Sequence, residues 1–339
     1  MRTPFALGIL GVVMLHSMPY FTSGLATAQT ATSEEESTVP EGENETKPSL
    51  GTSLLSKTAG GTQLWTDHLY RGEFRIQQNV LTGHWRLLDA DDVRRTWGTR
   101  AECEALLDDL QPKTSLKEKP GESPKHVVVL LHGLMRTRHS MKPLETKLAE
   151  AGYQDIIRFS YASSRSSIAD HAQALREVLE NFPTDTQFSF VGHSMGNIVV
   201  RHLISDLQRD GDPDGVLDRC RSMVMLGPPN QGAAIARRLA PTGLFGILTG
   251  KGGLELGQDW EDFGQNLATP PFPFAIIAGD VSGNRIQNPL VDGSGDFVVS
   301  LDEARLEGAE SFETVPVLHS FLMNDDTAND RTVEFIKSH

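Results

Sequence analysis

Short apolar runs alternate with amphipathic segments throughout residues 124–339. Runs typical of buried strands stand at HVVVLLHG, DIIRFSY, QFSFVG, RSMVMLG and FPFAIIAG. Apolar residues recur at helical spacing in PLETKLAEAG, in residues 168–182 and from Met195 to about Arg209. Strands that alternate with helices build βαβ units. The pattern therefore predicts an α/β fold, with a mostly parallel sheet flanked by helices, in residues 124–339.

Residues 61–123 show a different pattern, in which β-favouring and aromatic residues are interrupted by turns. Arg71-Gly72 and Thr82-Gly83 are turn signals, and the stretch TQLWTDHLYRGEFRIQQNVLTGHWRLLD predicts a small β meander. The segment TRAECEALLDDL, residues 99–110, predicts a short helix. No catalytic constellation stands out here. We expect a small β-rich extension that caps or extends the sheet of the following domain.

The first 60 residues have the composition of targeting and linking segments. Arg2 precedes the apolar run FALGILGVVML, and ATA at residues 26–28 fits the small-x-small pattern of a cleavage site. Residues 1–28 are therefore predicted to be a signal peptide of an exported protein, periplasmic or secreted, with an uncleaved N-terminal anchor as the alternative. Residues 29–60 are poor in large apolar residues, which predicts a disordered linker.

The acidic composition limits the partners that we expect, and the small number of cysteines limits the disulfides and metal sites. The chain of 339 residues has a formal net charge of −14. Nucleic acids need clustered Lys and Arg, so none is expected as a partner, and an acidic surface is not drawn to anionic membranes. The two cysteines, Cys103 and Cys220, either pair in an oxidising compartment or remain free thiols. No Cys/His cluster has zinc spacing, and we expect neither a metal nor a cofactor.

The candidate chemistry starts at Gly192-His193-Ser194-Met195-Gly196, between a predicted strand and a predicted helix. Functional groups gather at the carboxyl ends of the strands in open α/β sheets. A serine can project its hydroxyl there from a sharp turn, and glycines two residues before and after it leave room for the strand and helix to approach. We interpret Ser194 as a nucleophile.

A serine nucleophile needs a base, which is expected later in the chain and after a carboxylate. Only His202, His319 and His339 follow Ser194. His202 lies about two turns into the helix that follows the serine, and His339 is the last residue and is expected to fray. His319 follows a short apolar β-like run, in VPVLHSF, and is the predicted base.

The acid that orients the histidine has four candidates, Asp280, Asp292, Asp296 and Asp302. A triad acid must accept the histidine Nδ1–H from a loop beyond its strand. Asp280 stands close to its strand end. Asp296 lies in a glycine-rich turn before an apolar stretch, so we choose Asp296, with Asp292 second.

A tetrahedral intermediate also needs two backbone N–H donors that are fixed in advance. Met195, directly after the nucleophile, is one predicted donor, and Leu134 in LLHGLM is the other. His132 stands before Ser194 in the chain, and we expect it to have a structural role.

The motifs LLHGL, VGHSMG, MLGPPNQG, GDFVVS and VLHSF together resemble the α/β-hydrolase superfamily, especially its bacterial lipases and esterases. The resemblance covers about residues 124–339. It implies the triad Ser194, Asp296 and His319 and the oxyanion donors Leu134 and Met195. The first two strands of the larger hydrolase sheet are not evident. Either the meander at 61–123 takes their place or the core is a minimal one.

The resemblance implies a serine hydrolase that cleaves carboxylic esters through an acyl-enzyme on Ser194. The segment LAPTGLFGILTGKGGLELGQ, residues 239–258, is apolar and rich in glycine, which favours a lid or an acyl-binding wall, with an ordinary helix and loop as the alternative. The expected substrates are small-molecule or lipid esters, with transient contact to a lipid surface. Two other functions stay open: acyl transfer to a cell-envelope acceptor, and a non-catalytic binding protein with a hydrolase-like fold.

Overall fold

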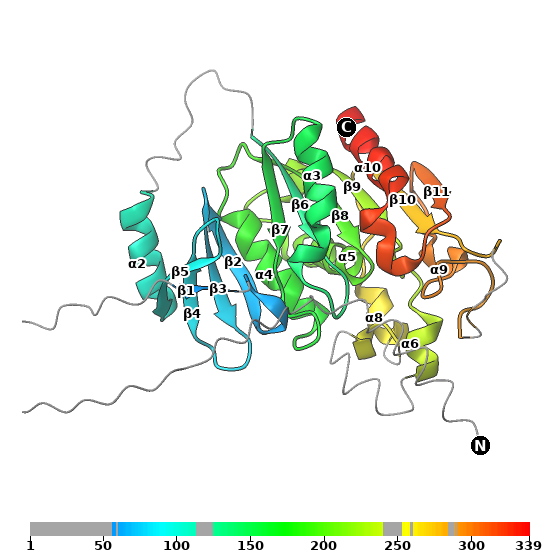
Figure 1. The fold of residues 1–339 in the computed structure, drawn as a ribbon, viewed down its shortest axis with the longest axis horizontal. Coiled ribbons are helices and arrows are strands. Elements are labelled where there is room, and N and C mark those ends of the chain that lie inside the picture. The colour runs from blue at the N-terminus through cyan, green and yellow to red at the C-terminus, as the bar shows by residue number, and fades with distance from the viewer. Residues whose placement is uncertain are drawn as a thin grey trace, which may run out of the picture. The chain divides into compact units, whose positions relative to one another are not determined.

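In the part of the chain that the structure describes, six parallel strands form a central sheet (Figure 1). The structure is a computed structural model. The strands are β6 (His126–Leu131), β7 (Asp155–Phe159), β8 (Gln187–His193), β9 (Cys220–Leu226), β10 (Phe274–Gly279) and β11 (Ser311–Val315). Their order across the sheet is β11-β10-β9-β8-β6-β7, and every neighbouring pair is parallel. The predicted α/β fold is confirmed.

The described residues are 56–58, 60–112, 125–239, 253–257, 260–283, 288 and 290–339. All of them belong to one compact unit, Leu55–His339. The predicted signal peptide, residues 1–28, and most of the predicted linker lie outside these residues. No helix among the described residues combines the length and the apolar character that crossing a membrane requires.

Both faces of the parallel sheet are covered by helices, because the inner strands are largely apolar on both sides. Along β6, Val127 and Val129 pack in one core cluster with residues of α4 and α5, whereas Val128 and Leu130 pack in a second cluster with residues of α3 and α10. The larger helices are α3 (Lys142–Glu150), α4 (Ile168–Glu180), α5 (Met195–Asp210) and α10 (Asp326–Ser338). The shorter described helices of this domain are η3 (Arg138–Met141), η4 (Leu217–Arg219), α6 (Ala234–Leu239), α8 (Trp260–Phe263), η6 (Gly264–Asn266), α9 (Leu301–Ala304) and η7 (His319–Asn324).

The N-terminal extension is a separate antiparallel sheet in the order β1-β5-β4-β3-β2, followed by one helix (Figure 1). Its elements are β1 (Ser56–Lys57), η1 (Thr62–Leu64), β2 (Trp65–Arg71), β3 (Phe74–Asn79), β4 (Trp85–Leu88), β5 (Val93–Gly98) and α2 (Arg100–Leu110). The meander and the helix agree with the sequence pattern. The linker prediction reaches too far, because β1 lies inside the range 29–60 and pairs with β5. Backbone pairing with β5 orders this strand although its residues are polar.

The extension is hydrogen-bonded to the chain directly after β7, the last strand of the parallel sheet. The Asp67 amide of β2 donates to the Ser160 carbonyl at 2.9 Å, and the Ser160 amide donates to the Asp67 carboxylate at 2.6 Å. Asp67 is fully buried, and these bonds satisfy polar groups that burial would otherwise penalise. The antiparallel sheet therefore stands at the β7 edge in place of further parallel strands.

The two cysteines are free thiols. Cys103 lies buried on α2 and Cys220 begins β9. Burial raises the pKa of both thiols to about 12, so neither is a reactive thiolate near neutral pH.

Candidate active site

Ser194 stands in a strained turn between the end of β8 and the start of α5. Its backbone has φ 53° and ψ −121°, a conformation that a residue with a side chain rarely adopts. The Ser194 amide donates to the Leu226 carbonyl at 2.9 Å, and the Asn197 side chain donates to the Ser194 carbonyl at 3.0 Å. These bonds hold the turn against its strain and raise the hydroxyl above the sheet edge.

The two flanking glycines are required by close packing. A Cβ on Gly196 would lie 2.7 Å from the Leu131 carbonyl oxygen, and a Cβ on Gly192 would lie 2.7 Å from the Asn197 backbone nitrogen. Real Cβ atoms do not approach backbone atoms this closely. The spacing of glycines around Ser194 is thus explained by the contact between β8, α5 and the end of β6.

Three residues that lie far apart in the chain form a continuous hydrogen-bonded row. His319 Nε2 lies 2.9 Å from Ser194 Oγ, and His319 Nδ1 lies 2.6 Å from Asp296 Oδ2. A carboxylate only accepts, so Nδ1 carries the proton and Nε2 is free to accept the serine proton. Asp296 is 1% exposed, and its other oxygen accepts from the Val298 and Val299 amides at 3.0 and 2.7 Å. The Asp296 carboxylate is therefore fixed in place by burial and by hydrogen bonds that need no ligand: two backbone amides on one oxygen and His319 on the other.

The other candidate acids lie elsewhere. The Asp292 side chain is 72% exposed and pairs with Arg238 at 2.6 Å. Asp280 accepts from the Ser282 amide at 2.9 Å and so closes its own turn. The Asp302 side chain is 96% exposed. Of the four aspartates, the structure brings only Asp296 to His319.

The two competing histidines are engaged in other contacts. His202 lies on α5 and is bonded to Asp206 at 3.0 Å. His339 does not fray as expected: its ring lies 3.0 Å from Glu310, and its carbonyl accepts from Arg221 Nε at 2.7 Å. A charged partner and a guanidinium at the C-terminal end hold this residue in place.

The predicted oxyanion donors flank Ser194. Met195 is the first residue of α5, directly after Ser194. The β6 loop, residues 132–137, comes against the serine from the other side, since a Cβ on Gly133 would lie 3.1 Å from Ser194 Cβ. Leu134 follows this close approach. The backbone near the Ser194 hydroxyl thus comes from the β6 loop and from the start of α5, the two segments that the sequence predicts for the oxyanion donors.

Two residues near the site were not singled out by the sequence. His193 Nε2–H donates to the His319 carbonyl at 2.9 Å, and Arg136 Nη2 donates to the Ser320 carbonyl at 3.2 Å. Burial, and then the neighbouring His319, hold the pKa of His193 well below its usual range. A neutral His193 therefore supports the backbone of His319. The only available signal was its position inside the Gly-His-Ser-Met-Gly motif.

His132 belongs to a buried column of rings beneath the β6 loop. Its ring stacks on Tyr161 with centroids 4.1 Å apart, and Tyr161 also packs against His171 at 4.7 Å. His132 Nδ1–H donates to the Gly133 carbonyl at 2.9 Å, and the Tyr161 hydroxyl donates to the His132 carbonyl. These contacts are those of a residue that shapes the loop.

The ring column makes the stability of the fold depend on pH. Burial lowers the pKa of His132 from 6.5 to about 4 and that of His171 to about 3. Both imidazoles stay neutral in the folded state, whereas the same side chains in the unfolded chain take up protons below about pH 6.5. The free energy of unfolding is therefore highest above that pH and falls as the pH drops toward 4. Each histidine contributes a slope of about 1.4 kcal/mol per pH unit. We expect His171→Leu to remove one such slope, measured as the unfolding free energy in urea from pH 7.5 to 4.5.

His84→Leu is the matched control for this measurement. His84 is exposed, so its ring meets water in both states and its replacement should leave the slope unchanged. A slope for His171→Leu equal to that of the unchanged protein would show that the buried ring takes up its proton without unfolding.

Among the described residues, no group of three or more His, Cys, Asp or Glu side chains is arranged to hold a metal ion. The segment 239–258 falls mostly outside the described residues. Of the part within them, Glu255 accepts from the Ile168 amide at 2.8 Å, at the start of α4.

Residues 121–227 match the model of a protein family described as "Putative serine esterase (DUF676)". No curated protein matches the chain. The mature lipase BlEst2 of Bacillus licheniformis is 16% identical over 65% of this chain and 95% of the lipase, with a TM-score of 0.48. A protein of Listeria innocua is 16% identical over 63% of this chain and 95% of its own, with a TM-score of 0.44. The metagenomic carboxyl esterase MGS0156 is 14% identical over 60% of this chain and 68% of its own, with a TM-score of 0.43.

The segment that matches the esterase family contains Ser194 and the β6 loop, whereas Asp296 and His319 lie after its end. It runs from just before β6, through the β6 loop and Ser194, to the end of β9. The parallel sheet, and the serine held between strand and helix with a buried histidine against it, agree with this match. Over residues 121–227 the chain is therefore similar to a family of serine esterases, and the arrangement around Ser194 is the one that such a family predicts.

Proposed function

We propose that the protein hydrolyses carboxylic esters through an acyl-enzyme on Ser194. The observation that carries this proposal is the hydrogen-bonded row of Ser194 Oγ, His319 Nε2 and Asp296 Oδ2, assembled from three separate loops. A serine hydroxyl becomes a nucleophile when an adjacent base takes its proton, and a buried carboxylate stabilises the imidazolium that forms.

In the first step, Ser194 Oγ bonds to the ester carbonyl carbon while its proton moves to His319 Nε2. The carbonyl oxygen becomes an oxyanion that accepts from the Leu134 and Met195 amides. When the ester C–O bond breaks, His319 returns the proton to the leaving alcohol. A water molecule then gives a proton to the same nitrogen and its oxygen bonds to the acyl carbon. When the bond between the acyl carbon and Ser194 Oγ breaks, His319 returns that proton to Oγ, which releases the carboxylic acid and regenerates the Ser194 hydroxyl.

Exposed apolar side chains close to His319 in the chain support an apolar acyl group. Leu318 precedes His319 and Phe321 follows it by two residues, and they are 41% and 37% exposed. Apolar surface at this place gives an acyl chain a site to pack against, which supports acyl or lipid esters as substrates and brief contact with a lipid surface. With the predicted signal peptide, we propose that the protein acts outside the cytoplasm.

A fluorophosphonate probe tests the nucleophile directly. The full-length protein should lose turnover of p-nitrophenyl esters as the probe is incorporated, and peptide mapping should place the label on Ser194. Turnover in the presence of added alcohols then separates hydrolysis, which releases free acid, from acyl transfer, which forms a new ester. A folded protein that binds esters but takes up no label would leave only the non-catalytic alternative.

A further inference from the structure

The β6 loop contains a strained turn just where it must present the Leu134 amide. The Arg136 amide donates to the Gly133 carbonyl at 3.2 Å, which closes a tight turn over residues 133–136. Met135, inside this turn, has φ 58°, in the left-handed region that disfavours residues with a Cβ. A backbone in this region persists only when surrounding contacts hold it there. The contacts of the flanking residues therefore decide where the Leu134 N–H points.

One of these contacts comes from Gln63, in the short helix η1 of the N-terminal extension. Its Nε2 donates to the Arg136 carbonyl, and its Oε1 accepts from the Ser164 amide at 2.9 Å. The amide group of Gln63 thus ties the β6 loop to the loop that follows β7. Arg136 is the residue directly after the strained Met135.

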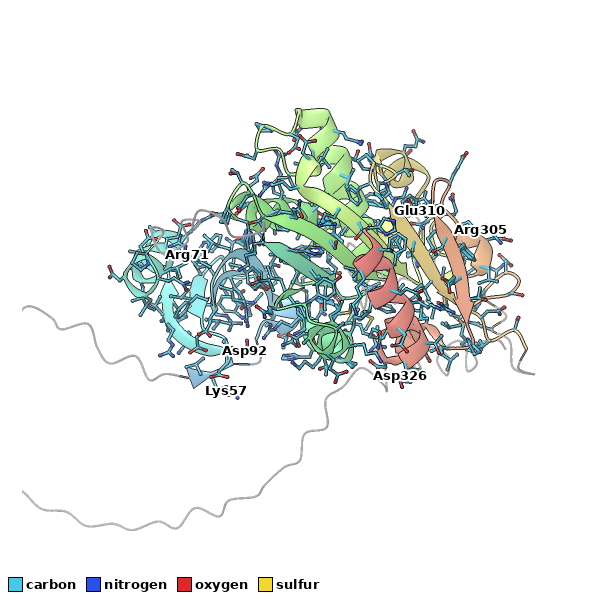
Figure 2. All side chains as sticks on the ribbon, turned by 90° about the horizontal axis from the view of Figure 1, so that it is seen from above. Lys57, Arg71, Asp92, Arg305, Glu310 and Asp326 are labelled. Carbon is cyan, nitrogen blue, oxygen red and sulfur yellow. The ribbon has the colours of Figure 1, made fainter. Side chains whose placement is uncertain are left out.

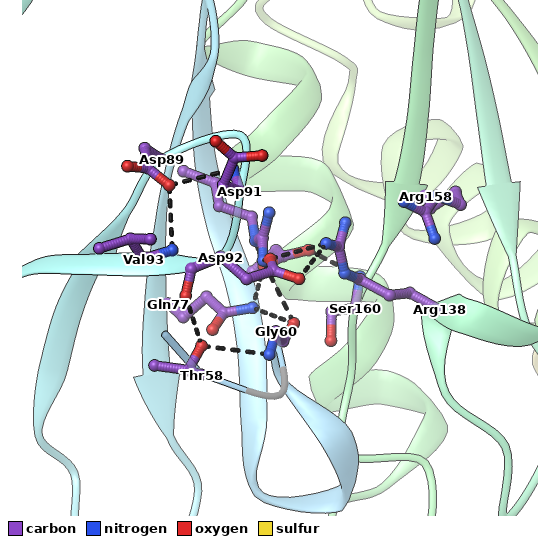
Figure 3. Close-up of polar contacts among 12 residues, drawn as sticks. Thr58, Gly60, Gln77, Asp89, Asp91, Asp92, Val93, Arg138, Arg158 and Ser160 are labelled. Atoms are coloured by element: carbon purple, nitrogen blue, oxygen red, sulfur yellow. Dashed lines mark hydrogen bonds and ion pairs between the residues drawn. The ribbon is translucent and has the colours of Figure 1, made fainter. Parts of the chain in front are cut away.

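A second contact comes from Asp92, in the turn between β4 and β5. Both Asp92 oxygens accept from Arg138 Nη2, at 2.7 and 2.9 Å (Figure 3). Arg138 begins η3, immediately after the β6 loop, and both side chains are buried. The ion pair therefore fixes the far end of the loop to the antiparallel sheet.

Asp92 is itself held rigidly, so it can serve as an anchor. The Arg75 guanidinium of β3 bonds to its carboxylate. The Asp92 carbonyl accepts from the Thr58 amide at 2.9 Å, and both residues are labelled in Figure 3. A Cβ on Gly60 would lie 2.5 Å from Asp92 Oδ2, which shows how closely the backbone packs on this carboxylate. Burial by itself would raise the pKa of Asp92, but Arg75 and Arg138 outweigh burial and lower this pKa below its usual range.

We propose that Gln63 and Asp92 are positioning residues of the active site, which hold the β6 loop so that the Leu134 N–H meets the developing oxyanion. This inference rests on the proposed function. Oxyanion donors act only within about 2.7–3.1 Å of the oxygen, and a displacement of about 1 Å can cost about 100-fold in rate. On this proposal the N-terminal extension contributes to catalysis by positioning the β6 loop.

The test uses Gln63→Ala and Asp92→Asn in the full-length chain. An oxyanion donor acts on the transition state more than on the bound ester. We therefore expect kcat to fall about 10- to 100-fold in each variant while KM changes less than about twofold. The Ki of a boronic acid that forms a tetrahedral adduct with the serine should rise by the same factor as kcat falls. The pH dependence of kcat/KM should be unchanged, because neither residue touches His319.

Arg71→Gln is the matched control. Arg71 is a buried arginine of the same antiparallel sheet, but it bonds to Asp108 and to the Gln111 carbonyl beside α2, away from Asp92 (Figure 2). Its loss should lower the melting temperature and leave kcat and the boronic acid Ki unchanged. Gln63→Ala leaves the buried ions intact, so it decides the matter even if Asp92→Asn does not fold.

The outcomes separate the two proposals. Suppose that the unchanged protein takes up the fluorophosphonate label on Ser194, but the kcat and boronic acid Ki of Gln63→Ala equal those of Arg71→Gln. The positioning role is then wrong, and the proposed function stands. Absence of the label from the folded, unchanged protein would overturn both.

Discussion

Replacing Ser194 by alanine is expected to lower kcat for p-nitrophenyl butyrate by about 10⁶-fold, because loss of a triad nucleophile removes the whole covalent route. His319 and Asp296 remain in place in this variant, but no hydroxyl is left to receive the acyl group. The measurement is steady-state turnover at saturating ester, with fluorophosphonate labelling of the same samples. The variant should also relieve the strained turn only slightly, since alanine keeps a Cβ at φ 53°.

Ser189→Ala is the control for this variant. Ser189 lies buried on β8 five residues earlier, where its hydroxyl bonds to Ser222 at 2.8 Å. Its removal should reduce stability by about 1 kcal/mol and leave kcat within about twofold. Residual turnover in Ser194→Ala close to that of Ser189→Ala would mean that another group is the nucleophile.

Replacing Asp296 by asparagine is expected to lower kcat by about 10⁴-fold, since the amide favours the wrong tautomer of the histidine. In the unchanged protein the carboxylate accepts from His319 Nδ1–H and leaves Nε2 open toward Ser194. An asparagine that presents its NH₂ group to Nδ1 would place the proton on Nε2, where it cannot accept the serine proton. The two amides that bond to the other oxygen should keep the loop in place.

Asp292→Asn is the matched control, because Asp292 was the second candidate in the sequence and lies four residues away. Its exposed carboxylate pairs with Arg238 at 2.6 Å, and its loss should change kcat by less than about twofold. If kcat fell in Asp292→Asn and stayed the same in Asp296→Asn, Asp296 would not be the acid that orients His319.

The parallel core and the hydrogen-bonded row of Ser194, His319 and Asp296 were predictable because both leave strong local signals. Strands buried on two faces must be apolar throughout, and a serine in a tight turn needs small neighbours at fixed spacing. The base is expected after the serine in the chain, and only three histidines follow Ser194. Asp296 could be preferred to Asp292 only by its glycine-rich turn, and burial now separates the two clearly.

The contacts between the N-terminal extension and the parallel-sheet domain could not be predicted from the sequence. They depend on Asp67, Asp92 and Arg138, which are charged residues that a pattern of apolar positions assigns to the surface. Their burial is favourable only because partners from distant segments satisfy them, and such pairs cannot be found by periodicity. The polar strand β1 was assigned to the linker for the same reason, because its pairing with β5 is a backbone contact.

The ion pair between Arg138 and Asp92 predicts the effect of an N-terminal truncation. A fragment that begins at residue 124 would retain the serine, the histidine and the aspartate, yet its Arg138 would have no carboxylate and its Ser160 amide no acceptor. The N-terminal extension is therefore expected to be needed for the stability of this fragment, because it supplies the partners of these buried polar groups. The smallest sensible expression unit starts upstream of Ser56.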